Sequence, residues 1–208
     1  GFEGLKAYTG KDGKVRIFRC EENALRMQKT AERVLMAAPP VELFREMVHK
    51  VVQLNARFIP PYGHGATLYI RPLLIGTSPE VGVKPSEEYL LIMFVVPVGP
   101  YFKEGFKPVD MMICRDFDRA APQGTGTVKV GGNYAASLQS LAIAKKAGFS
   151  STIYLDEMYK EVKIEGATFE GTDNFVVSAD ATYSVKFVVT WDGDASAAKE
   201  IKVIFAAL

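Results

Sequence analysis

A lysine set among glycines is the part of this sequence best suited to covalent chemistry. Lys129 lies in the stretch 124–134, GTGTVKVGGNY. The stretch lacks the Gly-Lys-Ser/Thr order of a nucleotide-binding P-loop, and its glycine spacing differs from that of the GxGxxG dinucleotide motif. From these residues alone, a structural turn and an active-site loop are both compatible with the pattern.

Schiff-base chemistry needs a lysine amine that is partly shielded from water and open to an incoming carbonyl compound. Small residues around Lys129 leave such room, and Tyr134 follows at the expected start of a helix. Because the N-terminus of a helix favours anions, the surroundings of the lysine also suit a negatively charged group.

Composition excludes several other classes of function. The 208 residues carry 25 Lys+Arg and 24 Asp+Glu, and a net charge of +1 offers no electrostatic footprint for nucleic acid or an anionic membrane. The longest apolar run, 90–98, is far shorter than the roughly 20 residues of a membrane helix. Two cysteines and two histidines without ligand spacing predict no metal site. We expect an intracellular, soluble protein; its compartment, cytoplasm or organelle matrix, stays open because the chain begins without a Met.

Apolar periodicity predicts the elements that must position these residues. A turn at 10–13 joins two strands, and amphipathic helices are expected at 21–36 and 41–58. Strands are expected at 67–75 and 88–96, the second one buried because polar alternation is missing. The remaining expected elements are a helix at 133–147 and strands at 109–114, 151–156, 162–164, 175–177, 185–190 and 201–205.

Five blocks of sequence occur in the order found in one enzyme family. They are FEGLKAY (2–8), RIFR with NALRM (16–27), LYIRPLLIG (68–76), PVGPYF (97–102) and VKVGGNYAAS (128–137). Together they resemble the branched-chain amino acid aminotransferases, which are fold-type IV pyridoxal-phosphate enzymes. The resemblance covers about residues 1–156, and nothing aligns after about residue 168.

The resemblance implies a cofactor, pyridoxal 5'-phosphate, and residues that hold it. Lys129 would form the Schiff base and then move the proton between the substrate Cα and the cofactor. Tyr134 would hydrogen-bond the phenolate oxygen, and Arg26 would hold the phosphate by a charge-assisted fork. Glu165 falls where the family has the partner of the ring nitrogen, and Thr168 falls on the phosphate side.

The resemblance also implies a substrate pocket lined by Phe2, Tyr69 and Arg71. An aromatic wall suits an aliphatic side chain, and Arg71 would assist with the distal carboxylate of an acidic substrate. The implied reaction moves the amino group of leucine, isoleucine or valine to 2-oxoglutarate, giving 2-oxo acids and glutamate, in a homodimer.

The implied fold is α/β, a two-domain class IV aminotransferase-like fold that is shortened at both ends. We expect a small α/β domain at 1–96, a linker at 97–105 and a large cofactor-binding domain at 106–208. The alternative function rests on the missing C-terminal phosphate loops. Under that alternative, the chain is a catalytically incompetent relative that serves as a structural or binding subunit.

Overall fold

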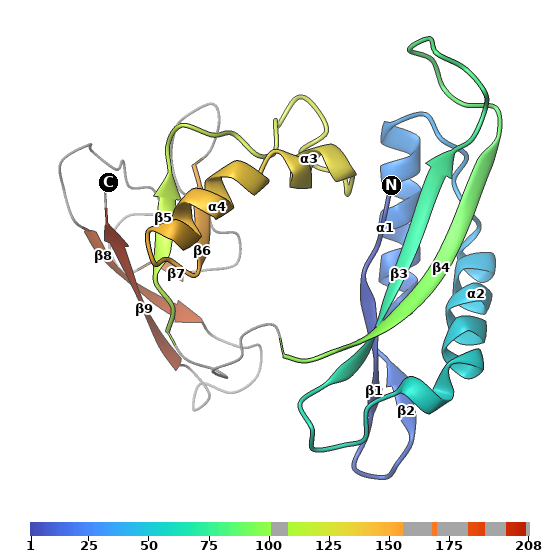
Figure 1. The fold of residues 1–208 in the computed structure, drawn as a ribbon, viewed down its shortest axis with the longest axis horizontal. Helices are drawn as coiled ribbons and strands as arrows, with labels where there is room; N and C mark the ends of the chain where they lie inside the picture. The colour runs from blue at the N-terminus through green and yellow to red at the C-terminus, as the bar shows by residue number, and fades with distance from the viewer. Residues whose placement is uncertain (101–107, 156–167, 170–182, 190–198, 207–208) are drawn as a thin grey trace. The chain divides into compact units, whose positions relative to one another are not determined.

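The computed structural model describes residues 1–100, 108–155, 168–169, 183–189 and 199–206. The chain divides into two compact units, each built on one β-sheet (Figure 1). Unit 1 is Gly1–Gly105 with Thr127–Gly131, and unit 2 is Phe106–Gly126 with Gly132–Leu208. The expected strands at 162–164 and 175–177 lie outside the described residues.

Unit 1 is an antiparallel sheet with two helices on one face (Figure 1). The strand order is β2-β1-β3-β4. The strands are β1 (Leu5–Thr9), β2 (Val15–Ile17), β3 (Thr67–Gly76) and β4 (Tyr89–Val98). The helices are α1 (Cys20–Arg33) and α2 (Val41–Leu54), with a short 3-10 turn at Ala56–Phe58. The expected hairpin and both expected helices are confirmed, with ends displaced by a few residues.

The core of unit 1 lies between the sheet and the two helices. On β3 the buried side chains alternate, with Leu68 and Ile70 fully buried and Leu74 nearly so. Phe44 of α2 and Met27 of α1 pack against this face. Each helix therefore buries the apolar stripe that its periodicity predicts.

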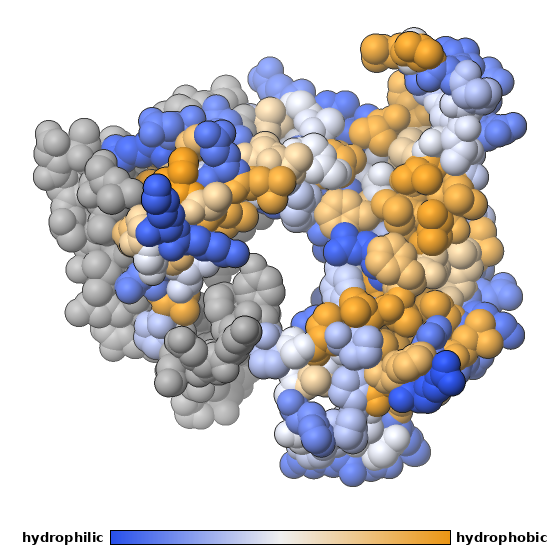
Figure 2. Space-filling model, in the orientation of Figure 1, coloured by the Kyte–Doolittle hydropathy of each residue, from blue (hydrophilic) through white to orange (hydrophobic). Residues whose placement is uncertain are grey.

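The expected burial of β4 is wrong. Leu90, Phe94 and Val96 are exposed, and apolar side chains gather over β3 and β4 (Figure 2). The reason is that these side chains lie on the face of the sheet that the helices do not cover, where Phe94 and Val96 stand opposite Arg71 and Tyr69 of β3. The alternate residues of β4 pack against the core. β4 is also the edge strand of this sheet. Pro97, which we expected to open the linker, instead belongs to β4 and lies opposite Leu68. An edge strand tolerates proline because the missing N–H faces no neighbour.

Unit 2 has a mixed sheet with the order β6-β5-β9-β8-β7. β5 is parallel to β6 and β9, whereas β8 is antiparallel to β7 and β9. The strands are β5 (Met111–Cys114), β6 (Ser151–Tyr154), β7 (Thr168–Phe169), β8 (Tyr183–Val189) and β9 (Lys199–Ala206). The helices α3 (Gly131–Ala135) and α4 (Leu138–Lys146) lie along the chain between β5 and β6.

The single helix expected at 133–147 is two helices. The break falls at Ser137, whose hydroxyl donates to the carbonyl oxygen of Tyr134 at 2.7 Å. A serine side chain that binds a nearby carbonyl competes with the regular helix bonds. The expected end at Gly148 is confirmed, because this glycine has a φ of 90° after the last turn.

Candidate active site

Four residues implied by the resemblance meet in unit 1. Tyr69 and Arg71 lie two positions apart on β3 and therefore share the sheet face opposite the core. Phe2 forms an isolated antiparallel bridge with Leu73, which places it beside them. The guanidinium carbon of Arg71 is 4.6 Å from the ring centre of Phe2 and 5.2 Å from that of Tyr69.

Lys129 joins this cluster from a distant part of the sequence. Its Nζ is 4.4 Å from the ring centre of Phe2, so two cations share one aromatic ring. Such contacts attract a cation to the electron-rich face of the ring. The arrangement places an amine, a guanidinium and two aromatic rings together.

The backbone of Lys129 is also held by unit 1. The N–H of Phe2 donates to the Lys129 carbonyl oxygen, and the Lys129 N–H donates to Oγ1 of Thr30, both at 3.1 Å. The N–H of Val130 donates to the Val128 carbonyl oxygen at 3.2 Å, which makes Lys129 the central residue of a tight turn. The residues around Lys129 therefore form a turn whose ends and centre are hydrogen-bonded.

Arg26, expected to hold a phosphate, is paired with an acid that we did not anticipate. Its Nε and Nη2 donate to Oε1 and Oε2 of Glu3, both at 2.7 Å. The Glu3 side chain is fully buried, whereas that of Arg26 is 55% exposed. Asn23 adds a third bond, from Nδ2 to Glu3 Oε2 at 2.8 Å. The carboxylate thus orients the guanidinium by a bidentate fork.

The sequence held a signal for Glu3. Its position alternates with Leu5 and Ala7, which are buried on the core side of β1. A carboxylate that continues such a buried face requires a cationic or hydrogen-bonding partner. We found no comparable signal for Thr30, because a threonine within a helix has no pattern that distinguishes it.

In unit 2, Tyr134 lies in α3, and the guanidinium carbon of Arg119 is 4.8 Å from its ring centre. The neighbouring Asn133 is buried and binds Thr125 twice. Its Nδ2 donates to the Thr125 carbonyl oxygen at 2.6 Å, and Thr125 Oγ1 donates to its Oδ1 at 3.0 Å. These bonds tie the start of α3 to the glycine-containing stretch before Lys129.

The last two expected site residues have no described side chain. Glu165 lies outside the described residues, and Thr168 begins β7, where its backbone lies opposite Val188. Their roles at the ring nitrogen and at the phosphate stay predictions.

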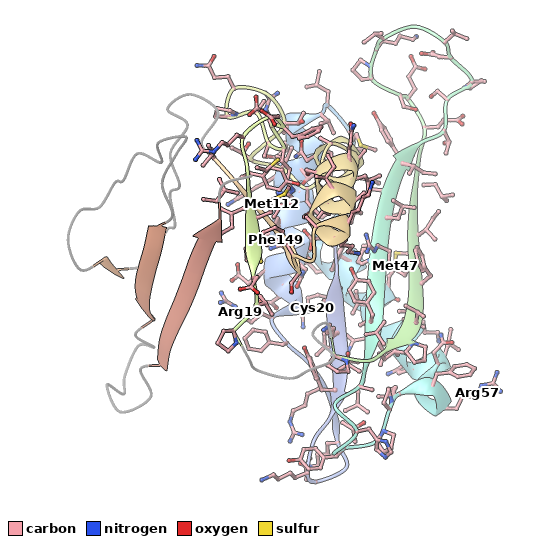
Figure 3. All side chains as sticks on the ribbon, turned by 60° about the vertical axis from the view of Figure 1, so that its left-hand side comes forward. Arg19, Cys20, Met47, Arg57, Met112 and Phe149 are labelled. Carbon is pink, nitrogen blue, oxygen red and sulfur yellow. The ribbon has the colours of Figure 1, made fainter. Side chains whose placement is uncertain are left out.

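Arg19 and Cys20 lie at the start of α1, where Figure 3 labels them. Together with Glu21, Glu22 and Arg45 they line a separate hollow. Burial raises the pKa of the Cys20 thiol, so it stays protonated near neutral pH. Among the described residues, no three His, Cys, Asp or Glu side chains gather in a way that could hold a metal ion. No helix in the described part of the chain is long and apolar enough to cross a bilayer.

Comparison with known proteins gives a consistent result along most of the chain. No family model matches it. A chloroplastic branched-chain-amino-acid aminotransferase of Arabidopsis thaliana is 52% identical over 159 residues, covering 76% of this chain and 38% of that protein. The branched-chain-amino-acid aminotransferase of Haemophilus influenzae is also 52% identical, over 74% of this chain and 46% of its own.

Solved structures agree with these relatives. The T.th. branched-chain amino acid aminotransferase with pyridoxamine 5'-phosphate has a TM-score of 0.62 and 27% identity, covering 81% of this chain and 54% of its own. The Escherichia coli branched-chain amino acid aminotransferase has a TM-score of 0.61 and 26% identity, covering 83% and 54%.

The α/β units and their solved neighbours define the fold of the class IV aminotransferases. Within that class, the 52% identity over three quarters of the sequence is decisive. Over the matched residues, this chain belongs to the branched-chain-amino-acid aminotransferase family. The chain spans 38% and 46% of the length of these two curated relatives.

Proposed function

We propose that this protein is a pyridoxal-phosphate-dependent transaminase that moves the amino group of leucine, isoleucine or valine to 2-oxoglutarate. The observation that carries the proposal is the position of Lys129, whose amine lies over Phe2 in a cluster with Tyr69 and Arg71. The relatives named above are aminotransferases of branched-chain amino acids, and one of the solved structures contains pyridoxamine 5'-phosphate.

Within unit 1, the donor groups of Lys129 and Arg26 suit pyridoxal phosphate, and Tyr134 of unit 2 is the further donor that the resemblance implies. The cofactor needs an amine, a cationic donor for its phosphate and a partner for its phenolate oxygen. In unit 1, Lys129 offers the amine and Arg26 an oriented, partly exposed guanidinium. In unit 2, Tyr134 offers a phenolic hydroxyl on an exposed side chain. When bound, the cofactor supplies the electron sink for the carbanion left at the substrate Cα.

Each residue of this chain then has a definite task. Lys129 Nζ would hold the cofactor and would act as the general base that takes the proton from the substrate Cα. Phe2 and Tyr69 present ring surface to an aliphatic side chain. Arg71 provides a guanidinium for the distal carboxylate of glutamate or 2-oxoglutarate, while its contacts with the two rings restrain its position.

The test is amino transfer from L-leucine to 2-oxoglutarate in the presence of added cofactor. We expect Lys129→Ala to lower kcat by about 10²- to 10⁴-fold, because a general base contributes on that scale. Lys50→Ala, on the exposed face of α2, is the matched control and should leave kcat unchanged. D-Alanine should be a poor donor. Equal rates for D-alanine and L-leucine would contradict the branched-chain assignment.

A lack of transfer in the unmodified protein would favour the structural or binding subunit over the enzyme. The homodimer stays a prediction, and sedimentation equilibrium of the protein would test it.

A further inference from the structure

The peptide group of Lys129 depends on partners far away in the sequence. Lys129 lies in no helix or strand, so its N–H and C=O need partners elsewhere. The carbonyl oxygen accepts from the N–H of Phe2, and the N–H donates to Oγ1 of Thr30. Thr30 is 99 positions away in the sequence, on α1.

Thr30 is well placed to act as a fixed acceptor. Its side chain is 1% exposed, so no bulk water competes for the bond. The methyl carbon of Thr30 lies so near Gly1 that a Cβ on Gly1 would be 3.0 Å from it. With the methyl group packed against Gly1, the hydroxyl is directed at Lys129. A β-branched side chain in a helix has few rotamers, which adds to this restraint.

We propose that Thr30 is a positioning residue for Lys129, and that its hydroxyl sets where the catalytic amine can reach. The inference rests on the proposed function. Thr30 acts through the Lys129 backbone and through no contact of its own with the reacting atoms. Because Nζ stands at the end of a flexible four-carbon stem, the position of Cα limits the space that the amine explores. A displacement of about 1 Å at a reacting group can cost about 10²-fold in rate.

Two substitutions separate positioning from packing. Thr30→Val keeps the β-branched shape and a similar helix propensity but removes the acceptor. Thr30→Ser keeps the acceptor and removes the methyl group. If Thr30 acted only by packing, the serine variant would be the more damaged of the two. If it positions Lys129, the valine variant is the damaged one and serine restores the function.

Two readouts are needed, one of which requires no cofactor. The first is amide hydrogen exchange at Lys129, followed in the unliganded protein. We expect exchange to be at least about tenfold faster in Thr30→Val and within about threefold of the unmodified protein in Thr30→Ser, since only the valine leaves the N–H without this acceptor. Unchanged exchange in Thr30→Val would overturn the proposal. Thr30→Ala serves as a second removal of the acceptor if the valine variant does not fold.

The second readout is the rate at which Lys129 is labelled by pyridoxal phosphate and borohydride. We expect Thr30→Val to lower this rate about 10- to 100-fold and Thr30→Ser to stay within about threefold. Labelling of Lys129 at equal rates in all three proteins would contradict the positioning role of Thr30 but leave the proposed function standing. If Lys129 of the unmodified protein is not labelled, the proposed function fails, and the positioning role fails with it.

Discussion

At the level of single residues, Glu3 and Arg26 form an ion pair whose two side chains differ strongly in burial. Glu3 is fully buried and Arg26 is mostly exposed, so the loss of either partner leaves a different charge behind. Arg26→Ala leaves a buried carboxylate without its cation. The cost of that is about 3–5 kcal/mol in the free energy of unfolding.

A second substitution tests this explanation, because the direction in which it changes the free energy of unfolding depends on whether Arg26 is present. In the Arg26→Ala background, Glu3→Gln removes the uncompensated charge, so we expect it to increase the free energy of unfolding. In the otherwise unmodified protein, the same Glu3→Gln change should decrease it, because the charged pair is lost. Urea unfolding followed by circular dichroism measures both changes. A decrease in both backgrounds would show that the buried charge is not the cause.

Residue roles divide into those that the sequence predicted and those that only the fold could show. The ordered blocks pointed to Phe2, Tyr69, Arg71 and Lys129, and the structure brings these four together. Thr30 could not be found in this way. Its bond to Lys129 joins segments 99 positions apart, and local periodicity contains no information about such pairs.

Among the elements and their connections, the glycine-containing stretch before Lys129 packs so closely at Gly126 that a side chain does not fit there. A Cβ on Gly126 would lie 2.5 Å from the carbonyl oxygen of Ala120 and 2.6 Å from that of Ala121. Backbone atoms cannot move aside as a flexible side chain can. We expect Gly126→Ala to lower the free energy of unfolding by about 1–3 kcal/mol, as overpacking does.

The matched control is Gly82→Ala, in the loop between β3 and β4. A Cβ on Gly82 meets no atom within 4 Å, so the free energy of unfolding should change by no more than about 0.5 kcal/mol. Thermal unfolding of both variants makes the comparison. If both variants lost the same free energy of unfolding, close packing at Gly126 would not be the cause of its effect.

The elements also show which sequence patterns were reliable. Helices α1 and α2 were predicted because their apolar stripes face a core that is formed nearby. The burial of β4 was predicted wrongly, since an apolar run does not show whether both faces of the strand are covered, and only one face of β4 packs against the core. The break at Ser137 was missed because the apolar period continues through it, while the hydroxyl bond to Tyr134 does not show in that period.

At the scale of the whole molecule, the chain crosses between its two units more often than a contiguous division implies. The expected division was contiguous, with a linker at 97–105. The structure instead assigns Thr127–Gly131 to unit 1, although the residues on both sides of it belong to unit 2. Within this segment, the backbone of Lys129 is hydrogen-bonded to Phe2 and Thr30. It could not be predicted from composition shifts, because so short a segment has no composition of its own.

Lys129 is the amine that we propose binds the cofactor. The most direct measurement is incubation of this protein with pyridoxal phosphate, reduction with borohydride, and mapping of the labelled peptides. We expect one phosphopyridoxyl group per chain on Lys129, with little on the exposed Lys145 and Lys146 of α4. Label spread over such exposed lysines, with none on Lys129, would contradict the claim.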